Sequence, residues 1–517
     1  MSRSYNIYTA VAVSVFFVSW SLIIIGKFFT LHSYVFDLGF VMERLWQPYH
    51  IVSSSFYIFL LFNSAFQFVL SPLYFLHSFI AILFAQLILF TLSVYPLYKL
   101  TKEKLGHSYY AMLVSVAFLL YFPASGILWF DVHFQSFFVP IFIFAYYFYS
   151  KERYMASAIF FLLSGTVRFP YMILPFLFSF LELLTFLFNK STIWNKKKFY
   201  ANFVVFTIAI VLLAGGFYYN DIASSPTFLT QASLAYPARL LSLILTLLVI
   251  MGPFLFIPLI RFRWLVLSLP FFLLGVYTGS ANYTFPIVMS LQYTSMIVPI
   301  VFLGFIEGME TRHRKNHLCK TGRGLIPKLM EVKSLKRVSG KFTNKRSTIL
   351  GAILCILVVG SLFYQPYGPL NDVSNFQYHI TNDVGFNSTN YNTLMKLVNM
   401  VPKNNPYVLF QNDMPEMLPR PSISPIPFLS TIYISSNISV SEVSNNSFPL
   451  INTISINGQN LTNVHVDYIL AYNKSSSYTL QFSSSQATMK QLVQLAINSG
   501  KYSIIGGQNG FMLLERN

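Results

Sequence analysis

The chain has 517 residues, of which 55% are hydrophobic and only 10% are charged. Soluble domains carry roughly 25% charged residues, so this composition excludes an ordinary water-soluble enzyme and indicates a polytopic membrane protein. The net charge of +18 at pH 7 is concentrated in short loops between apolar segments, above all in 312–346, where twelve Lys/Arg accompany one acid, Glu331. Segregated basic loops are the positive-inside pattern of membrane proteins, and we expect no nucleic-acid partner.

Apolar segments of spanning length predict an α-helical membrane protein with about eleven transmembrane helices. The first segment lacks a small-residue cleavage site, so we predict a retained anchor rather than a signal peptide. The spans are expected near 7–26, 76–98, 108–128, 135–150, 154–167, 171–188, 200–218, 237–260, 264–279, 291–306 and 348–363.

An alternating count of these spans, with Arg3 inside, places the basic loop 307–347 in the cytoplasm. The segment 27–75 is interrupted by Ser and Asn, and a span there would move the later basic loops outside. We therefore predict that it forms one or two amphipathic helices at the outer surface. The count gives a multi-pass cell-membrane protein with a transmembrane domain, 1–363, and an extracytoplasmic domain, 364–517.

The outer region has seven basic and seven acidic residues and no cysteine, which excludes a disulfide within it. Its pattern predicts a small α/β domain, with long surface loops over 412–465. The expected elements are helices at 391–401 and near 486–499, strands at 407–411, 466–472, 502–505 and 511–515, and a hairpin turn over 506–510.

Five N-x-Ser/Thr sequons fall in this outer region. Each marks an exposed loop if it is glycosylated, whereas a Ser/Asn-rich domain also produces the tripeptide by chance. The candidate glycosylation sites are Asn387, Asn437, Asn445, Asn460 and Asn473.

Two acidic motifs follow the outer ends of apolar spans. Asp37 lies within Phe36–Phe40, and Asp131 precedes His133 within Trp129–Phe134. A carboxylate between apolar neighbours at the membrane surface costs free energy unless it is paired or used. These groups suit a general base, an orienting acid, or ligands of a divalent cation such as Mg²⁺ or Mn²⁺; helix capping, with His133 stacked at the interface, is the alternative.

Arg168 lies between two predicted spans and has no acid near it in sequence. A guanidinium suits a phosphate partner, although an arginine at this position can also snorkel to the interface. Glu182, inside a predicted span, is expected to face another helix. Walker, Rossmann and Gly-x-Ser-x-Gly motifs are absent from the sequence, which argues against ATP-driven transport and soluble-cofactor redox chemistry.

The order of these motifs resembles a prokaryotic membrane-protein family. Asp37-Leu38-Gly39 is followed by Glu43 and Trp46, then by Pro72-Leu73-Tyr74 and a span containing Gln86, by Asp131-x-His133, and by Gln292-Tyr293 ahead of Pro299. In this respect the chain resembles the domain-of-unknown-function family numbered two thousand and seventy-nine, allied to the GT-C glycosyltransferase superfamily. The resemblance implies a GT-C-like fold.

The resemblance also implies a glycosyltransferase with a polyprenyl-phosphate-linked sugar donor, an active site at the outer face, and Asp37 as the catalytic acidic residue, which would act as general base or help to hold a divalent ion. Asp131 and His133 would complete that site, with or without a divalent metal. Arg168, Glu43, Arg44 and Trp46 are the expected substrate-binding residues, and the acceptor is an unidentified glycan or protein. The alternative is a non-enzymatic membrane scaffold or a lipid or solute transporter, and a transporter would place polar residues near the bilayer midplane.

Overall fold

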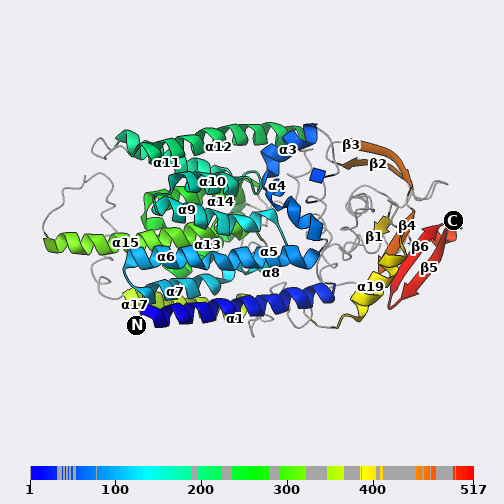
Figure 1. Ribbon diagram of the computed structural model, residues 1–517, viewed down its shortest axis with the longest axis horizontal. Helices are drawn as coiled ribbons and strands as arrows, with labels where there is room; N and C mark the ends of the chain where they lie inside the picture. The colour runs from blue at the N-terminus through cyan, green and yellow to red at the C-terminus, as the bar shows by residue number, and fades with distance from the viewer. Residues whose placement is uncertain are drawn as a thin grey trace.

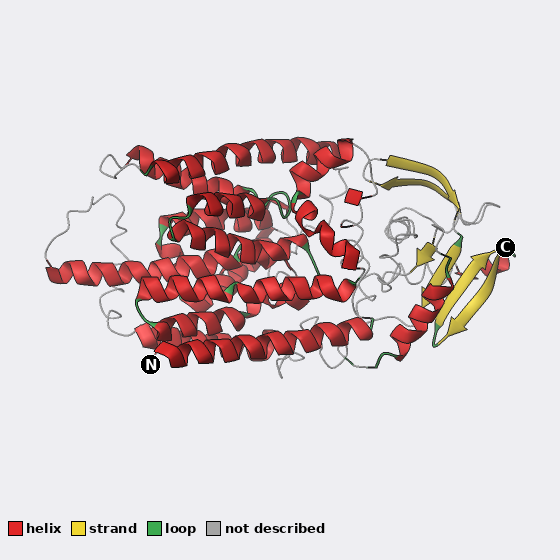
Figure 2. Cartoon of the chain, in the orientation of Figure 1, coloured by secondary structure: helices red, strands yellow, loops and turns green. Residues whose placement is uncertain are grey.

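The computed structural model is an elongated bundle of helices with a β-sheet beyond one end (Figures 1 and 2). It describes residues 2–31, 38, 41, 45, 48–49, 54–76, 78–129, 131–188, 195–223, 236–278, 292–321, 346–365, 385, 387–402, 408–410, 450–456, 459–465, 467–472, 493–494 and 496–517. The α-helices are α1 (Ser2–Phe29), α3 (Ser54–Ser64), α4 (Phe66–Leu70), α5 (Phe79–Leu92), α6 (Val94–Leu105), α7 (Ser108–Leu119), α8 (Ser125–Trp129), α9 (Phe138–Ser150), α10 (Tyr154–Gly165), α11 (Ile173–Phe188), α12 (Lys196–Ala223), α13 (Tyr236–Met251), α14 (Phe262–Thr278), α15 (Val298–Thr321), α17 (Arg346–Tyr364) and α19 (Thr389–Met400). Short 3₁₀ helices are η2 (Ser71–Leu76), η3 (Phe122–Ala124), η4 (Phe134–Phe137), η6 (Gly252–Phe254), η7 (Ile257–Ile260) and η10 (Gln292–Met296).

Five helices among the described residues are long and apolar enough to cross a membrane, and a sixth is counted if α7 and the segment Phe122–Trp129, bent by 48°, form one span. Each of the eleven predicted spans coincides with helical structure, but the others are shorter. Prolines explain part of the shortening, because Pro123, Pro253 and Pro258 begin or interrupt the 3₁₀ turns and proline cannot donate a helical hydrogen bond. The structure therefore supports a helical membrane bundle, with fewer full-length spans than the sequence predicts.

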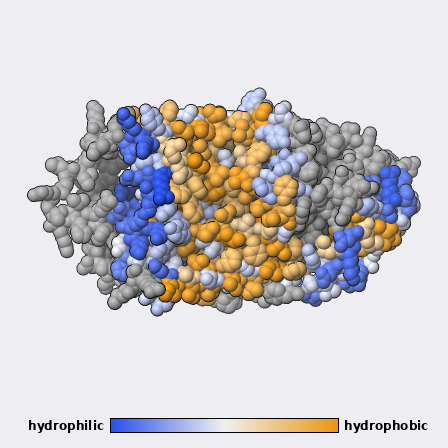
Figure 3. Space-filling model, in the orientation of Figure 1, coloured by the Kyte–Doolittle hydropathy of each residue, from blue (hydrophilic) through white to orange (hydrophobic). Residues whose placement is uncertain are grey.

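The bundle is organised around α15. The span Tyr293–Glu310 is 83% buried inside the protein, whereas the span of α1 is only 28% buried. Phe302 of α15 packs edge-on against Phe118, Tyr121 and Phe254, with ring centroids 4.9–5.3 Å apart. Peripheral helices instead present apolar side chains outward, as the orange belt of Figure 3 shows, which is the surface expected against lipid.

Two glycines of α15 allow the 3₁₀ turn η7 to approach closely. A Cβ on Gly308 would lie 2.7 Å from the backbone oxygen of Ile257, and one on Gly304 would lie 3.0 Å from that of Pro258. We expect Gly308→Ala to destabilise the protein by about 1–3 kcal/mol, since a backbone oxygen cannot swing away and overpacking costs that much. Thermal unfolding in detergent measures this. Gly351→Ala, where a Cβ meets nothing within 4 Å, is the control, and equal melting of both variants would contradict the prediction.

The two ends of the bundle differ in charge. At one end the first residues of α1 lie beside the end of α6, because the Tyr98 hydroxyl donates to Asn6 Oδ1 at 2.5 Å. Lys104 of α6 pairs there with Glu310 of α15 at 2.8 Å. We call this the basic end, and a hydrophilic band marks it in Figure 3. At the opposite end Phe28 and Phe29 of α1 pack against Tyr391 of α19, with ring centroids 5.3 Å apart.

The described C-terminal strands are β1 (Val408–Phe410), β2 (Leu450–Ile456), β3 (Gln459–His465), β4 (Tyr468–Tyr472), β5 (Tyr502–Gln508) and β6 (Phe511–Arg516). Four of them form a sheet in the order β1-β4-β6-β5, with β1 and β4 parallel and the other neighbours antiparallel. The helix α19 packs on this sheet, so helix and strands occur together as predicted. Of the predicted helix near 486–499, residues 493–494 and 496–498 are helical and the remaining positions lie outside the described residues, apart from a turn at Ser499.

Two local predictions for this region were wrong. The turn is not 506–510: β5 continues to Gln508, and Asn509 and Gly510 form a two-residue connection with φ of +53° and +89°. Asn-Gly is the favoured pair for such a tight hairpin. The predicted loop over 412–465 contains the antiparallel pair of β2 and β3, and the Asn457-Gly458 dipeptide between them is a hairpin signal in the sequence.

Two sequons fall on described residues. Asn387 is exposed just before α19, where its Oδ1 accepts hydrogen bonds from the Thr389 amide at 3.0 Å and hydroxyl at 2.6 Å. Asn460 lies in β3. Asn437, Asn445 and Asn473 lie outside the described residues, and glycosylation of all five stays a prediction.

Candidate functional site

A buried ion pair joins the first helix to the Asp-x-His motif at the end opposite the basic end. Lys27 Nζ lies 3.4 Å from Asp131 Oδ1, and the two side chains are only 7% and 2% exposed. The same ammonium donates to the carbonyl oxygen of Trp129 at 2.6 Å and lies 5.0 Å from the centroid of its ring. Lys27 thus holds both the end of α8 and the carboxylate that follows it.

Gln86 of α5 fixes the other side of the motif. Its Nε2 donates to the carbonyl oxygen of Ile127 at 2.7 Å, and its Oε1 accepts from the His133 amide at 3.4 Å. The last carbonyls of a helix have no intrahelical donor, so Lys27 and Gln86 supply donors to two carbonyls of α8. His133 itself is partly exposed, and it is followed directly by η4.

The sequence explains why the helix is interrupted between α7 and α8. The helical run of α7 ends at Leu119, and Pro123 follows inside η3. All five residues of α8 are buried, and Asp131 after them is only 2% exposed. The chain then continues through η4 into α9 inside the bundle. The arrangement sets Asp131 and His133 on a rigid, packed support, as a site requires.

Arg168 lies on a second connection at the same end, between α10 and α11. The Ser64 hydroxyl donates to the Val167 carbonyl at 2.9 Å, and the Phe66 amide donates to the Thr166 carbonyl at 3.1 Å. These bonds tie the connection to α3 and α4. Arg168 is half-buried, and within the described part of the chain its guanidinium forms no ion pair. A guanidinium in this state is available for an anionic ligand.

Packing links the two connections, although no direct contact joins Arg168 to Asp131 among the described residues. Phe66 of α4 packs against Phe137 of η4, with ring centroids 5.4 Å apart. The Tyr171 hydroxyl, next to the Arg168 connection, lies 2.9 Å from Ser295 Oγ of η10. Because η10 also contacts α8 and η4, both connections rest on the same group of elements.

The remaining predicted site residues, Asp37, Glu43, Arg44 and Trp46, lie outside the described residues. Leu38, Val41 and Leu45 are described beside them and are buried, with exposures of 0%, 2% and 0%. Their spacing of three and four residues is that of one helix face, and these three side chains pack inside the protein. In the described residues no three metal-ligating side chains come together. The predicted metal set of Asp37, Asp131 and His133 stays a prediction because it includes Asp37.

Lys27 is the site residue that sequence analysis did not select. The available signal was its position, since it is a lysine at the outer end of the first predicted span. Its partner lies 104 positions further along the chain, and nothing local in the sequence joins the two.

A second buried polar network lies at the basic end and gives Glu182 its partners. This carboxylate, 1% exposed, pairs with Lys198 Nζ at 2.7 Å and with Arg263, and accepts from the Tyr149 hydroxyl. Glu307 in turn accepts from Trp264 Nε1 at 2.8 Å. The network ties α9, α11, α12, α14 and α15 together, as expected for a glutamate that faces other helices.

Comparison with known proteins finds a matching family and similar solved structures. A family model described as "Predicted membrane protein (DUF2079)" matches residues 27–513. Among solved structures, ArnT from Cupriavidus metallidurans, in a crystal structure bound to undecaprenyl phosphate, matches with a TM-score of 0.48 and 10% identity, over 98% of this chain and 97% of that one. None of the curated proteins matches the chain.

Proposed function

This chain belongs to the predicted-membrane-protein family DUF2079, and we propose that it is an integral-membrane glycosyltransferase using a polyprenyl-phosphate-linked sugar donor. The active site lies at the end of the bundle opposite the basic end, which the positive-inside rule assigns to the outer face. The acceptor is a glycan or a protein, and the unit after residue 364 lies outside the membrane next to the site.

The buried pair of Lys27 and Asp131 is the observation that carries this proposal. Taking two charges out of water costs more free energy than an apolar pair of similar size, so stability alone does not favour such a pair. Ionisable residues buried in a membrane domain mark functional sites by default. The pair also joins the end of α1, after which the Asp37 segment begins, to the Asp131-x-His133 motif.

The chemistry assigns one task to each charged group. The acceptor atom bonds to the anomeric carbon, its proton passes to the Asp37 carboxylate, and the bond from that carbon to the phosphate oxygen breaks. The electron pair leaves with polyprenyl phosphate, so the main electrostatic demand is stabilisation of the leaving phosphate. Arg168 binds that phosphate, and His133, which is partly exposed, orients the sugar and acceptor. The buried pair of Lys27 and Asp131 holds the His133 segment in position.

The charged partner of Asp131 argues against a divalent cation at this carboxylate. The Lys27 ammonium lies 3.4 Å from this carboxylate and already balances its charge. A metal ion bound to Asp131 would have to displace that ammonium. We therefore propose transfer without a divalent metal, with EDTA leaving turnover unchanged. Loss of turnover in EDTA, restored by Mg²⁺ or Mn²⁺, would instead support the metal set of Asp37, Asp131 and His133.

Replacing Arg168 tests the phosphate assignment. Arg168→Ala is expected to raise the KM for the donor roughly 10- to 150-fold, because a charge-assisted hydrogen bond contributes about 1.5–3 kcal/mol. Arg168→Lys keeps the charge but loses the forked geometry. Its KM for the donor is expected to lie between those of wild type and Arg168→Ala. Steady-state kinetics with varied donor measures this, and an unchanged KM in Arg168→Ala would remove Arg168 from the site.

A donor panel separates the proposed transferase from other membrane functions. Purified protein in liposomes is incubated with polyprenyl-phosphate-linked sugars, and both the release of polyprenyl phosphate and the movement of intact donor across the bilayer are followed. Release supports the transferase. Movement of intact donor would identify a transporter, and neither event with any donor would favour a scaffold.

A further inference from the structure

A groove runs along α1 where this helix meets α5 and α6. It has a volume of about 650 Å³ and is lined on the α1 side from Asn6 to Val18. The twelve helical steps from Asn6 to Val18 extend roughly 18 Å, which is close to the depth of one leaflet in a hydrocarbon core about 30 Å thick. Val18, Ile88 and Leu92 on its walls are 55%, 44% and 48% exposed, so the groove opens on the surface that faces lipid.

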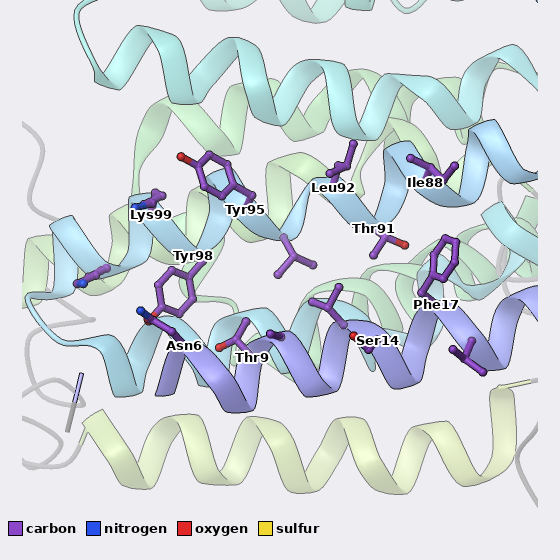
Figure 4. A pocket seen from close by; sticks show the side chains of 15 residues that line it. Asn6, Thr9, Ser14, Phe17, Ile88, Thr91, Leu92, Tyr95, Tyr98 and Lys99 are labelled. Carbon is purple, nitrogen blue, oxygen red and sulfur yellow. The ribbon is translucent and has the colours of Figure 1, made fainter. Parts of the chain in front are cut away.

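The groove is polar at one end. Figure 4 shows Asn6, Tyr98 and Lys99 gathered there, and Lys102 also lines the groove. These residues lie at the basic end, where the Tyr98 hydroxyl donates to Asn6 Oδ1. Lys99 Nζ lies 5.6 Å from the ring centroid of Tyr95. The side chains offer an ammonium and an amide donor at one mouth.

The charge of these two lysines is not balanced locally. In the part of the chain that the structure describes, neither Lys99 nor Lys102 forms an ion pair, whereas Lys104 pairs with Glu310 and Lys151 pairs with Glu103. Nearby lysines at the same end are thus neutralised by protein carboxylates. The groove mouth keeps an excess of positive charge, which calls for an anion.

Beyond the mouth the groove is mainly apolar, and the hydroxyls of Thr9 and Thr91 on its walls donate to carbonyls of their own helices. Figure 4 shows Phe17, Ile88 and Leu92 further along it, and Val13 and Val18 also line it. On the α1 wall Ala10 is exposed and small, which leaves room for an alkyl chain. The occupant therefore combines an anionic head with an apolar tail of about one leaflet's length.

We propose that this groove binds one anionic phospholipid, with its phosphate between Lys99 and Lys102 and one acyl chain along α1. Anionic lipids are attracted to basic segments at the membrane surface, and the groove lies at the end that carries the basic loops. The site is distinct from the proposed sugar-transfer site, which lies at the opposite end, and its occupation does not depend on that function.

Native mass spectrometry of the full-length protein tests the proposal, with phosphatidylglycerol and phosphatidylcholine of matched acyl chains as probes. Wild type is expected to retain phosphatidylglycerol at least 10-fold better than phosphatidylcholine. Lys99→Ala/Lys102→Ala is expected to lose this preference. Lys196→Ala/Lys197→Ala removes two exposed lysines at the basic end of α12, outside the groove, and is expected to keep it.

A second pair of variants tests the acyl chain. Ala10→Trp fills the groove and is expected to abolish retention of the first phosphatidylglycerol, whereas Val11→Trp, at an exposed neighbouring position that does not line the groove, is expected to retain it. Both substitutions change exposed residues, and thermal unfolding verifies that each variant is folded.

Three outcomes would overturn the proposal. Equal retention of the two lipids by wild type would show that the groove does not select an anionic headgroup. An equal preference for phosphatidylglycerol in the two lysine double variants would show that Lys99 and Lys102 do not bind the headgroup. Displacement of phosphatidylglycerol by millimolar glycerol 3-phosphate would identify a site for a soluble phosphate in place of a lipid.

Discussion

Lys27→Met is expected to destabilise the membrane bundle by about 3–5 kcal/mol, the cost of leaving one member of a buried ion pair without its partner. Asp131, only 2% exposed, would keep a buried negative charge beside an apolar methionine side chain, and the carbonyl of Trp129 would lose its donor. Thermal or denaturant unfolding in detergent measures the loss. The melting temperature should fall below that of wild type and of Lys197→Ala, which changes an exposed lysine.

The double variant Lys27→Met/Asp131→Leu separates the pair from its surroundings. An apolar pair avoids the desolvation cost of the charges, so we expect the double variant to recover most of the stability that Lys27→Met loses. A double variant no more stable than Lys27→Met would contradict the assignment of the loss to the unpaired carboxylate. If the pair serves the proposed site, the stable double variant should still lack donor turnover, and full turnover would reduce the pair to a structural role.

The helical framework could be predicted from the sequence because lipid imposes a simple requirement. Each backbone polar group in the bilayer must be satisfied within its own helix, so every span appears as an apolar segment. What the pattern did not predict is where segments break. The bend of 48° between α7 and Phe122–Trp129 depends on Pro123 and on packing in the bundle, and hydropathy averages over both.

The site was predictable only in part. Asp131 and His133 could be selected because a carboxylate between apolar neighbours at a span end is costly, and Arg168 because it has no acid near it in sequence. The structure places Arg168 half-buried and without an ion pair among the described residues. The Lys27 pair could not be predicted, since it joins residues 104 positions apart through tertiary packing. The β2–β3 hairpin differs from the prediction for another reason: the Pro-, Ser- and Asn-rich composition of 412–465 is typical of loops and obscures the Asn457-Gly458 turn signal.

Asp37→Asn is expected to lower donor turnover roughly 100- to 10,000-fold at saturating donor, the range that a positioned general base contributes. Asparagine keeps the size and hydrogen-bonding shape of aspartate but cannot take the acceptor's proton. The loss should therefore appear in kcat, whereas the Arg168 variants should change the donor KM. Unfolding temperatures equal to wild type would verify that Asp37→Asn is folded.

The proposed enzyme transfers a sugar from a lipid phosphate at a site that includes Asp37. The most direct measurement is the rate of polyprenyl phosphate release from a consumed donor by wild type and Asp37→Asn, side by side at saturating donor. We predict release by wild type, matched one for one by sugar appearing on the product, and loss of both in the folded variant. Equal release of polyprenyl phosphate by the two proteins, or no release from any donor by wild type, would contradict sugar transfer at Asp37.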